Sequence, residues 1–310
     1  MNVIKKTDEY DYFDIEAELS ILIKGKEKIL ILEGESDLRF FRLLLNRTDT
    51  VLPFCINSHD CKTDLIKLFK NNESIQNNKR ILGIIDKDLD DYNNLKYKYN
   101  NLIVTDFADL DCYMIYFSSF ENFLIEYLNK DSVKETFGFL PALNIEKFRR
   151  IIHDSLIEFT KLRIANDNFN LQIPLGKIFK KSPIKDRKDR YKKFSKIISK
   201  DFKVQHKTLF SYIFSTGMCK NIDMGSCLEK FNVIKSDKYD LYTNGHDIIS
   251  ILTCICNAHN PTKNDIEIEQ SLRLTLNKEV FKEFNCTYIV SNWIFDDFNK
   301  PTNMEVALTL

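Results

Sequence analysis

The chain has 310 residues, with 45 basic and 45 acidic side chains, so its formal net charge is zero. Apolar residues make up 44% and charged residues 29% of the sequence, values that exclude collagen-like, disulfide-framework and wholly disordered proteins. The N-terminus is acidic and has no apolar leader, which argues against a secretory signal, and no apolar run is long enough to span a bilayer. Eight cysteines without framework spacing indicate a reduced, cytoplasmic protein, and the short apolar runs predict no membrane contact.

Four short apolar runs alternate with helical patterns in the first 111 residues. Residues 28–33, 51–56, 81–85 and 102–104 have the apolar character of buried strands. Helical spacing follows the first two runs, and Ser36 is predicted to cap the first helix. The alternation predicts βαβ units and a parallel sheet, so the expected fold class is α/β.

The pattern changes after residue 111. Helical spacing then dominates, and strand-like runs return at 239–242 and 286–290. We therefore predict three parts: an α/β unit at 1–111, a large and mostly helical insertion at 112–235, and a C-terminal α/β part at 236–310. The last part is expected to rejoin the sheet and to pack on the first unit.

Acidic residues follow three of the four predicted strands. Glu33 ends the first strand, Asp86 and Asp88 end the third, and Asp109 and Asp111 follow the fourth. The carboxyl ends of parallel strands share one edge, so we expect these carboxylates to lie together.

Carboxylates that lie this close repel one another unless a cation sits between them. Oxygen ligands of this kind suit Mg²⁺ or Mn²⁺, and such a site can polarise a phosphodiester. The sequence therefore predicts a Mg²⁺ or Mn²⁺ site. The alternative is that the acids are helix caps and turn residues, which is most plausible for Asp109 and Asp111.

Basic residues are concentrated between 177 and 207, where thirteen Lys and Arg stand against three Asp. Tyr191, Phe194, Ile197 and Ile198 would line one helical face and leave a basic face to solvent. Such a surface binds phosphates without regard to base sequence. The alternatives are a solvated helix or a dock for an acidic partner. The predicted nucleic-acid-binding residues are Lys87, Arg187, Lys188, Arg190, Lys192 and Lys193.

The tripeptide Gly-His-Asp at 245–247 precedes an apolar helical run. Its structural interpretation is a turn and an N-cap. An imidazole titrates near neutrality, so His246 is also a candidate proton donor or phosphate contact.

At this point the residues resemble a known family. Ile-Leu-Glu-Gly-Glu-Ser-Asp at 31–37 and Gly-Ile-Ile-Asp-Lys-Asp at 83–88 resemble the Toprim domain of primases, topoisomerases and overcoming-lysogenization-defect nucleases. That family has a Glu after its first strand and Asp-x-Asp after its third. The resemblance implies a Toprim-like, Rossmann-like sheet, with Glu33 as general acid or base and Asp86 and Asp88 as metal ligands.

Two further segments, Thr-Asp-Phe-Ala-Asp-Leu-Asp at 105–111 and Asn-Gly-His-Asp at 244–247, resemble a Toprim-like family of unknown function. That family includes the effectors of PARIS anti-phage systems, and it often has Asp-x-Glu where this chain has Asp109 and Asp111. The resemblance implies a toxic nuclease that acts on tRNA, with DNA as the other candidate substrate. It also implies an ABC/AAA-type ATPase partner, a homodimer as one active form, and a catalytic role for His246.

Two other functions fit the motifs. One is a catalytically inert Toprim-like module that binds and regulates an ATPase. The other is a haloacid-dehalogenase-like phosphatase, which also has Asp-x-Asp after a strand. That chemistry favours a small Thr or Val after the motif, whereas Leu89, Asp90 and Asp91 follow here, and it leaves Glu33 unexplained.

Overall fold

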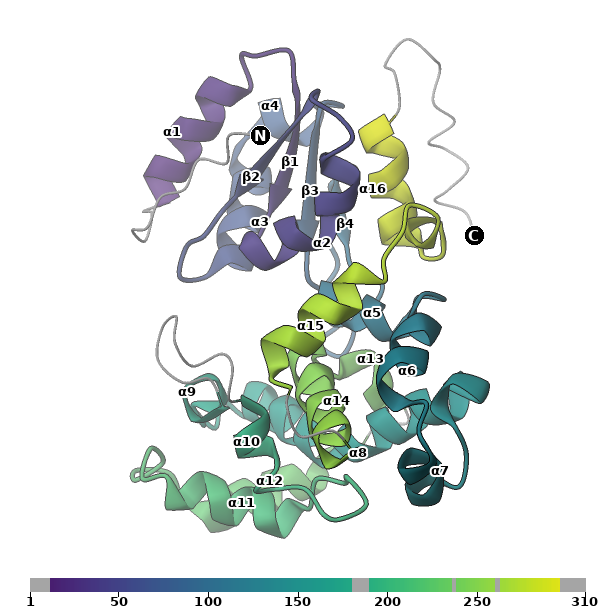
Figure 1. The fold of residues 1–310 in the computed structure, drawn as a ribbon. Helices are drawn as coiled ribbons and strands as arrows, with labels where there is room; N and C mark the ends of the chain where they lie inside the picture. The colour runs from purple at the N-terminus through teal and green to yellow at the C-terminus, as the bar shows by residue number, and fades with distance from the viewer. Residues whose placement is uncertain (1–11, 180–189, 236–237, 260–262, 296–310) are drawn as a thin grey trace. The chain divides into compact units, whose positions relative to one another are not determined.

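The computed structural model describes residues 12–179, 190–235, 238–259 and 263–295 (Figure 1). These residues form two compact units. The first unit takes the chain up to Asp86, Lys96–Asp106 and the chain from Asn277. The second unit takes Lys87–Leu95 and Phe107–Leu276. The chain therefore leaves the first unit after Asp86, returns to it for Lys96–Asp106, and returns again from Asn277.

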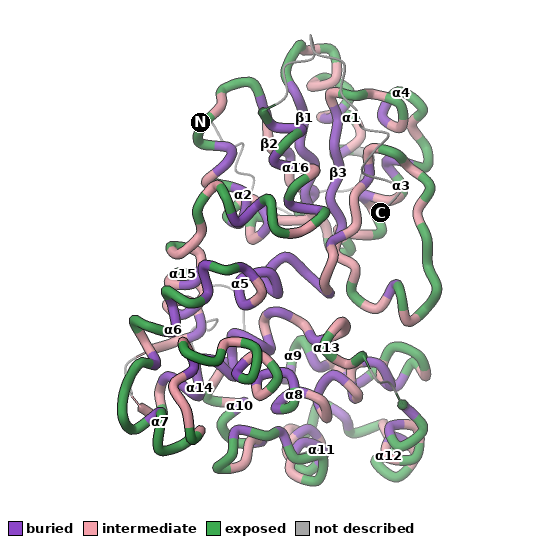
Figure 2. Tube along the Cα trace, turned by 90° about the vertical axis from the view of Figure 1, so that its right-hand side faces the viewer, coloured by how far each residue is buried: buried purple, intermediate pink, exposed green. Residues whose placement is uncertain are grey.

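The first unit is built on a four-stranded parallel sheet with the order β2-β1-β3-β4. Its central strands β1 and β3 are buried along their whole length (Figure 2). All four predicted strands and the α/β fold class are confirmed, although two predicted runs extend one residue beyond the strand. The strands are β1 Lys28–Leu32, β2 Val51–Cys55, β3 Ile81–Ile85 and β4 Leu102–Val104.

Helices cover both faces of this sheet. Strands β2 and β3 lie on opposite sides of β1, so right-handed connections place α2 and α3 on opposite faces. On the α3 face, Ile29 and Ile31 belong to one buried cluster with Leu68 and Phe69. On the other face, the ring of Phe40 packs against the ring of Phe281 in η4, with 5.6 Å between the ring centres. The helical elements of the first unit are α1 Tyr12–Leu22, α2 Glu35–Leu45, α3 Cys61–Asn71, α4 Glu73–Gln76, η4 Val280–Lys282 and α16 Asn285–Phe295.

The N-cap of α2 is Gly34 rather than the predicted Ser36. The carboxylate of Asp37 accepts a hydrogen bond from the Gly34 N–H at 2.9 Å. This contact satisfies a donor at the helix start from within the first turn, so the helix begins earlier than the Ser signal indicated.

Helix α16 is held at both ends by the sheet. Asp106 Oδ2 accepts from the N–H of Cys286 at 2.9 Å, and Lys28 Nζ donates to the carbonyl of Trp293 at 2.6 Å. An anion at the start and a cation at the end both suit the helix dipole. From Asn277 the chain therefore does return to the first unit, but it does so as a helix beside the sheet, and the strand predicted at 286–290 is wrong. Cys286, Val290 and Trp293 are buried at spacings of four and three, which is the period of a helix.

The second unit is helical throughout its regular elements. The run at 239–242, predicted as a strand, is helix α13. This unit extends to Leu276, so the helical insertion continues past the predicted boundary at 235. Across the described ranges, no helix is both long and apolar enough to cross a lipid bilayer. The elements are η1 Leu110–Cys112, α5 Tyr113–Tyr116, α6 Phe120–Leu128, α7 Asp131–Phe137, η2 Pro141–Leu143, α8 Ile145–Asn168, α9 Leu175–Phe179, α10 Arg190–Phe194, α11 His206–Ser215, α12 Met224–Val233, α13 Tyr239–Tyr242, α14 Gly245–His259 and α15 Asp265–Leu274.

Candidate functional site

Glu33 and Asp86 lie side by side at the carboxyl edge of the sheet. Glu33 follows β1 and Asp86 follows β3, and Glu33 Oε1 accepts a hydrogen bond from the Asp86 N–H at 2.8 Å. The chain leaves these two strands in opposite directions, toward β2 and toward β4. This is the switch point at which open α/β sheets bind their ligands. The first unit therefore brings two of the predicted site residues together where a ligand is expected.

The surroundings of Glu33 favour an anion and leave its neighbouring thiol inert. Helix α2 begins two residues later, and the positive end of its dipole attracts negative charge. Cys55 ends β2, and burial, followed by the charges of Asp37 and Glu35, raises the pKa of its thiol to about 12. Since only a thiolate binds metal well, a divalent cation at this edge would be held by oxygen atoms and not by Cys55.

Asp88, the second residue of the second unit, has an unusual backbone conformation. Its φ angle is 50°, and its N–H donates to the carbonyl of Ala108 at 2.7 Å. Asp tolerates this left-handed region better than most residues, and such residues are frequent at functional sites. The adjacent Lys87, a predicted nucleic-acid contact, has its ammonium 3.3 Å from the carboxylate of Asp91.

The donor set of the strand ends fits Mg²⁺ or Mn²⁺. Mg²⁺ is usually held by one or two carboxylates together with water and substrate phosphate, rather than by an all-protein cage. Glu33 and Asp86 supply that number of carboxylates in the first unit, and Asp88 follows two residues along the chain. Within the described ranges, no group of three or more His, Cys, Asp or Glu forms a metal cage. The pair nevertheless meets the smaller requirement of Mg²⁺.

Asp109 has the contacts of a cap. Its Oδ1 accepts from the N–H of Cys112 at 3.0 Å, across η1, and its Oδ2 accepts from the N–H of Gly245 at 2.8 Å. Burial and then the neighbouring charge of Asp111 raise the pKa of Asp109 to about 6.

Asp111 lies between the side chains of His246 and Arg273. His246 Nδ1 is 3.1 Å from Asp111 Oδ2, and Arg273 Nη2 is 3.1 Å from Asp111 Oδ1. Burial disfavours the charged carboxylate, but His246 and Arg273 outweigh it and lower the pKa of Asp111 to about 2. All four oxygens of Asp109 and Asp111 thus accept from protein groups. These contacts match the cap and turn alternative, and the role of both residues as metal ligands stays a prediction.

His246 is the second residue of α14, and 37% of its side chain is exposed. Its bond to Asp111 fixes one ring nitrogen. Asp111 and His246 both belong to the second unit, whereas Glu33 and Asp86 belong to the first. Each group is thus assembled within its own unit.

Glycine is required at position 245 because the start of α14 packs closely against Asp109 and Asp111. A Cβ on Gly245 would lie 2.3 Å from Asp109 Oδ1 and 2.5 Å from Asp111 Cβ, which real side chains do not allow. The sequence pattern gave no sign of this packing, because the residues are 136 positions apart. The missed partner Arg273 is equally remote in sequence.

Arg190 does not lie on the solvent-exposed face where the charge pattern placed it. It is buried, and its guanidinium pairs with the buried carboxylate of Asp247, which Arg163 also binds at 2.6 Å. Burial alone would raise the pKa of Asp247, but Arg163 and Arg190 hold it below its usual value. A buried carboxylate needs such counter-ions, which explains why this arginine is drawn inward.

The other predicted nucleic-acid contacts have different environments. Lys192 is exposed, and Lys193 donates to the carbonyl of Ile178. Arg187 and Lys188 lie outside the described residues. The predicted helical face is interrupted, because α10 ends at Phe194.

No model of a known protein family matches the sequence, and no curated protein matches it significantly. The interpretation of the site therefore rests on its residues and their geometry. Chemically, the strand ends bring the Glu33 carboxylate against the Asp86 backbone beside a helix start, a placement suited to a divalent cation and a phosphate ester.

Proposed function

We propose that the chain is a Mg²⁺- or Mn²⁺-dependent nuclease of Toprim type that cleaves phosphodiester bonds in nucleic acid. The observation that supports this most directly is the contact between Glu33 Oε1 and the Asp86 N–H at the switch point of the sheet. When bound, the metal ion polarises the phosphodiester and stabilises the charge on the leaving oxygen.

The strand-end residues divide the remaining work. The Asp86 N–H holds the Glu33 carboxylate in one position, where it can move a proton to or from the attacking or leaving oxygen. As the Toprim resemblance implies, Asp86 and Asp88 would hold the metal ion. Asp109 and Asp111 anchor the start of α14 through Gly245 and His246.

The substrate class is supported by the basic surface of the second unit. Lys192, Lys196, Lys200 and Lys203 are all exposed, with one acid, Asp201, among them. Such a surface attracts the phosphate backbone of any nucleic acid. The Toprim resemblance supports the further proposal that the substrate is tRNA and that the chain is a toxic anti-phage effector. It also supports an ATPase partner, and the eight free cysteines are consistent with work in the cytoplasm.

The test is cleavage by the purified full-length chain. We would incubate it with tRNA, total RNA and plasmid DNA in the presence of Mg²⁺, Mn²⁺ or EDTA. Glu33→Gln is the test variant, and Glu27→Gln, at the amino end of the same strand, is the matched control. We expect metal-dependent cleavage that falls by about 100-fold or more in Glu33→Gln and is unchanged in Glu27→Gln. Equal cleavage by both variants would overturn the assignment.

Metal binding provides a second readout. Titration with Mn²⁺, followed by the loss of its free electron-paramagnetic-resonance signal, should show binding by the parent chain and weaker binding by Asp86→Asn. If the parent binds no Mn²⁺ and cleaves none of the three substrates, the nuclease proposal fails. Normal assembly with an ATPase under those conditions would favour the inert binding module.

A further inference from the structure

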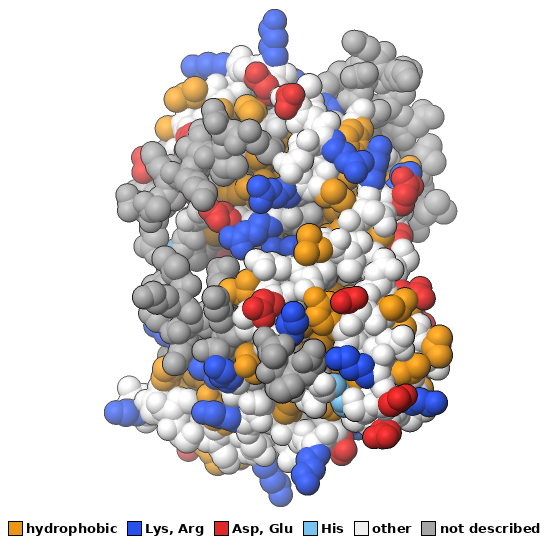
Figure 3. Space-filling view, viewed as in Figure 1, with side chains coloured by type: hydrophobic (Ala, Val, Ile, Leu, Met, Phe, Trp, Pro, Cys, Tyr) orange, Lys and Arg blue, Asp and Glu red, His pale blue; other side chains and the backbone are white. Residues whose placement is uncertain are grey.

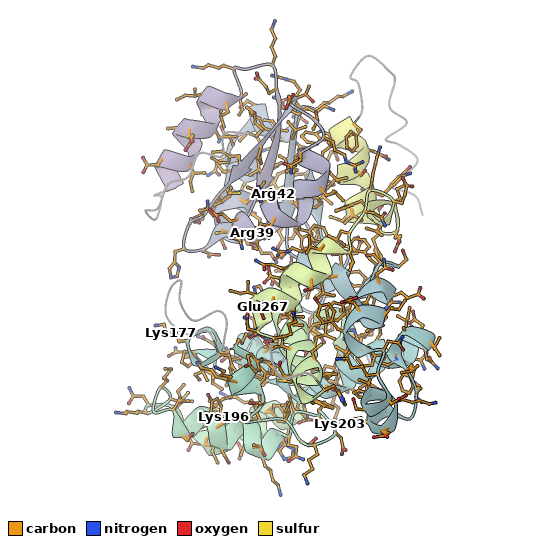
Figure 4. The ribbon with its side chains drawn as sticks, viewed as in Figure 1. Arg39, Arg42, Lys177, Lys196, Lys203 and Glu267 are labelled. Carbon is orange, nitrogen blue, oxygen red and sulfur yellow. The ribbon has the colours of Figure 1, made fainter. Side chains whose placement is uncertain are left out.

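Helix α2 presents arginines to solvent beside the strand-end carboxylates. The exposed side chains between 35 and 47 are Glu35, Arg39, Arg42, Asn46 and Arg47. Arg39 and Arg42 lie about one helical turn apart, and both project from α2 (Figure 4). In the space-filling view, Lys and Arg side chains gather over this helix (Figure 3).

These arginines are weakly engaged by protein acids. Arg39 Nη2 is 3.4 Å from Glu35 Oε2, with both side chains about half exposed, at 49% and 50%. An exposed pair of this kind contributes little and is readily exchanged for another anion. Among the described residues, Arg42 has no ion-pair partner. The remaining acid of the helix, Asp37, is buried and accepts from the Gly34 N–H.

The position of α2 sets how far the two arginines lie from Glu33. Because α2 starts two residues after Glu33, Arg39 and Arg42 lie about 6 Å and about 10 Å along its axis from Glu35. A phosphodiester held at Glu33 and Asp86 would have its neighbouring phosphates within one or two helical turns. Guanidinium groups bind phosphate through two parallel hydrogen bonds, which suits them to this contact.

We propose that Arg39 and Arg42, on the exposed face of α2, bind the phosphates of a nucleic-acid strand that flank the phosphodiester presented to Glu33 and Asp86. This inference rests on the proposed nuclease function and adds to it a substrate-binding surface in the first unit. The ligand chemistry is the phosphodiester backbone, shared by RNA and DNA.

The test measures binding without cleavage. In a Glu33→Gln background, fluorescence anisotropy would follow binding of a labelled tRNA and of a labelled single-stranded DNA 20-mer at several salt concentrations. The test variant adds Arg39→Gln and Arg42→Gln. The matched control adds Lys67→Gln and Lys70→Gln, which remove two exposed charges from α3 on the opposite face of the sheet.

We expect the arginine variant to bind on the order of tenfold more weakly at 0.1 M salt, with the slope of log K against log salt reduced by about 2. The control should bind as its parent does, and Arg39→Lys with Arg42→Lys should retain most of the slope. If the arginine variant binds both probes more weakly, the arginines contact the backbone that RNA and DNA share. If it binds only one probe more weakly, that nucleic acid is the ligand of the arginines. Equal binding of both probes by the arginine variant and the control would overturn the inference.

The same experiment separates this inference from the proposed function. The salt slope of binding is measured whether or not the wild-type chain cleaves nucleic acid. The contact of the two arginines with phosphate is therefore tested even if no cleavage is found. If wild type cleaves and the arginine changes leave both the slope and kcat/KM intact, the nuclease stands and the surface does not. Matching thermal unfolding of all variants would show that the folds are comparable.

Discussion

The ammonium of Lys28 donates to the carbonyl of Trp293 at 2.6 Å, and so joins the first strand to the last described helix across 265 positions of sequence. Lys28 is buried, and its second contact is the carbonyl of Ile294 at 3.4 Å. We expect Lys28→Met to keep the packing of the stem but to leave the carbonyls at the end of α16 without this donor. The cost should be about 1–3 kcal/mol in the free energy of unfolding, measured with urea. Lys26→Met, at an exposed position, should change it by less than about 0.5 kcal/mol, and an equal effect of both would contradict the role of Lys28.

Gly245 offers a test in which helix propensity and packing predict opposite signs. In an ordinary helix, Gly→Ala gains up to about 1 kcal/mol. Here the new Cβ would lie 2.3 Å from Asp109 Oδ1, so we expect Gly245→Ala to lose about 1–3 kcal/mol instead. Gly176→Ala in α9 is the control, because nothing lies within 4 Å of its Cβ position. Thermal unfolding of both variants measures the difference, and stabilisation by Gly245→Ala would show that Asp109 does not approach this closely.

The buried carboxylate of Asp247 should make the second unit sensitive to acid. Its pKa is held below the ordinary value by Arg163 and Arg190, which outweigh burial, so its folded form binds a proton less readily than its unfolded form. The stability it contributes is therefore present above pH 3.8 and is lost as the pH falls below that value. Asp247→Asn should cost about 3–5 kcal/mol at pH 7, because two arginines lose their counter-ion. The difference from wild type should shrink in urea unfolding at pH 3, and a constant difference would contradict the ion-pair account.

The sheet and its two central carboxylates could be predicted because their causes are local in sequence. Apolar runs of three to six residues predicted the strands, and the carboxyl ends of parallel strands share one edge of the sheet. Glu33 and Asp86 then had to lie at one edge. The helix at 285–295 was harder, since a short apolar run has the same composition in a buried strand and a buried helix.

The contacts of Asp109, Asp111 and Arg190 could not be predicted from spacing. Each depends on a partner more than 50 positions away, in α14 or α15. A sequence pattern can show that a carboxylate follows a strand. It does not show whether amide and guanidinium donors from elsewhere already bind that carboxylate, as they bind Asp109 and Asp111 here.

The described part of the basic segment should contribute to nucleic-acid binding by charge alone. Lys196 and Lys203 are exposed, and the ammonium of Lys196 lies 5.8 Å from the ring centre of Tyr212. We expect Lys196→Gln with Lys203→Gln to weaken tRNA binding and to reduce its salt slope by about 2. Lys134→Gln with Lys235→Gln, at exposed positions outside 177–207, is the control for lost charge. Equal slopes for the two double variants, measured by anisotropy, would show that the segment is only a solvated surface.

Asp88 has two features that substitution can separate, a left-handed backbone and a carboxylate. Asn tolerates a φ of 50° nearly as well as Asp, so Asp88→Asn should change the free energy of unfolding by less than about 0.5 kcal/mol. It removes the charge, however, and should weaken Mn²⁺ binding and metal-dependent cleavage at least about tenfold. Asp49→Asn, which also removes an exposed carboxylate, should leave both unchanged. Normal Mn²⁺ affinity and cleavage in Asp88→Asn would mean that Asp88 serves the turn after β3 and that Glu33 and Asp86 hold the metal without it.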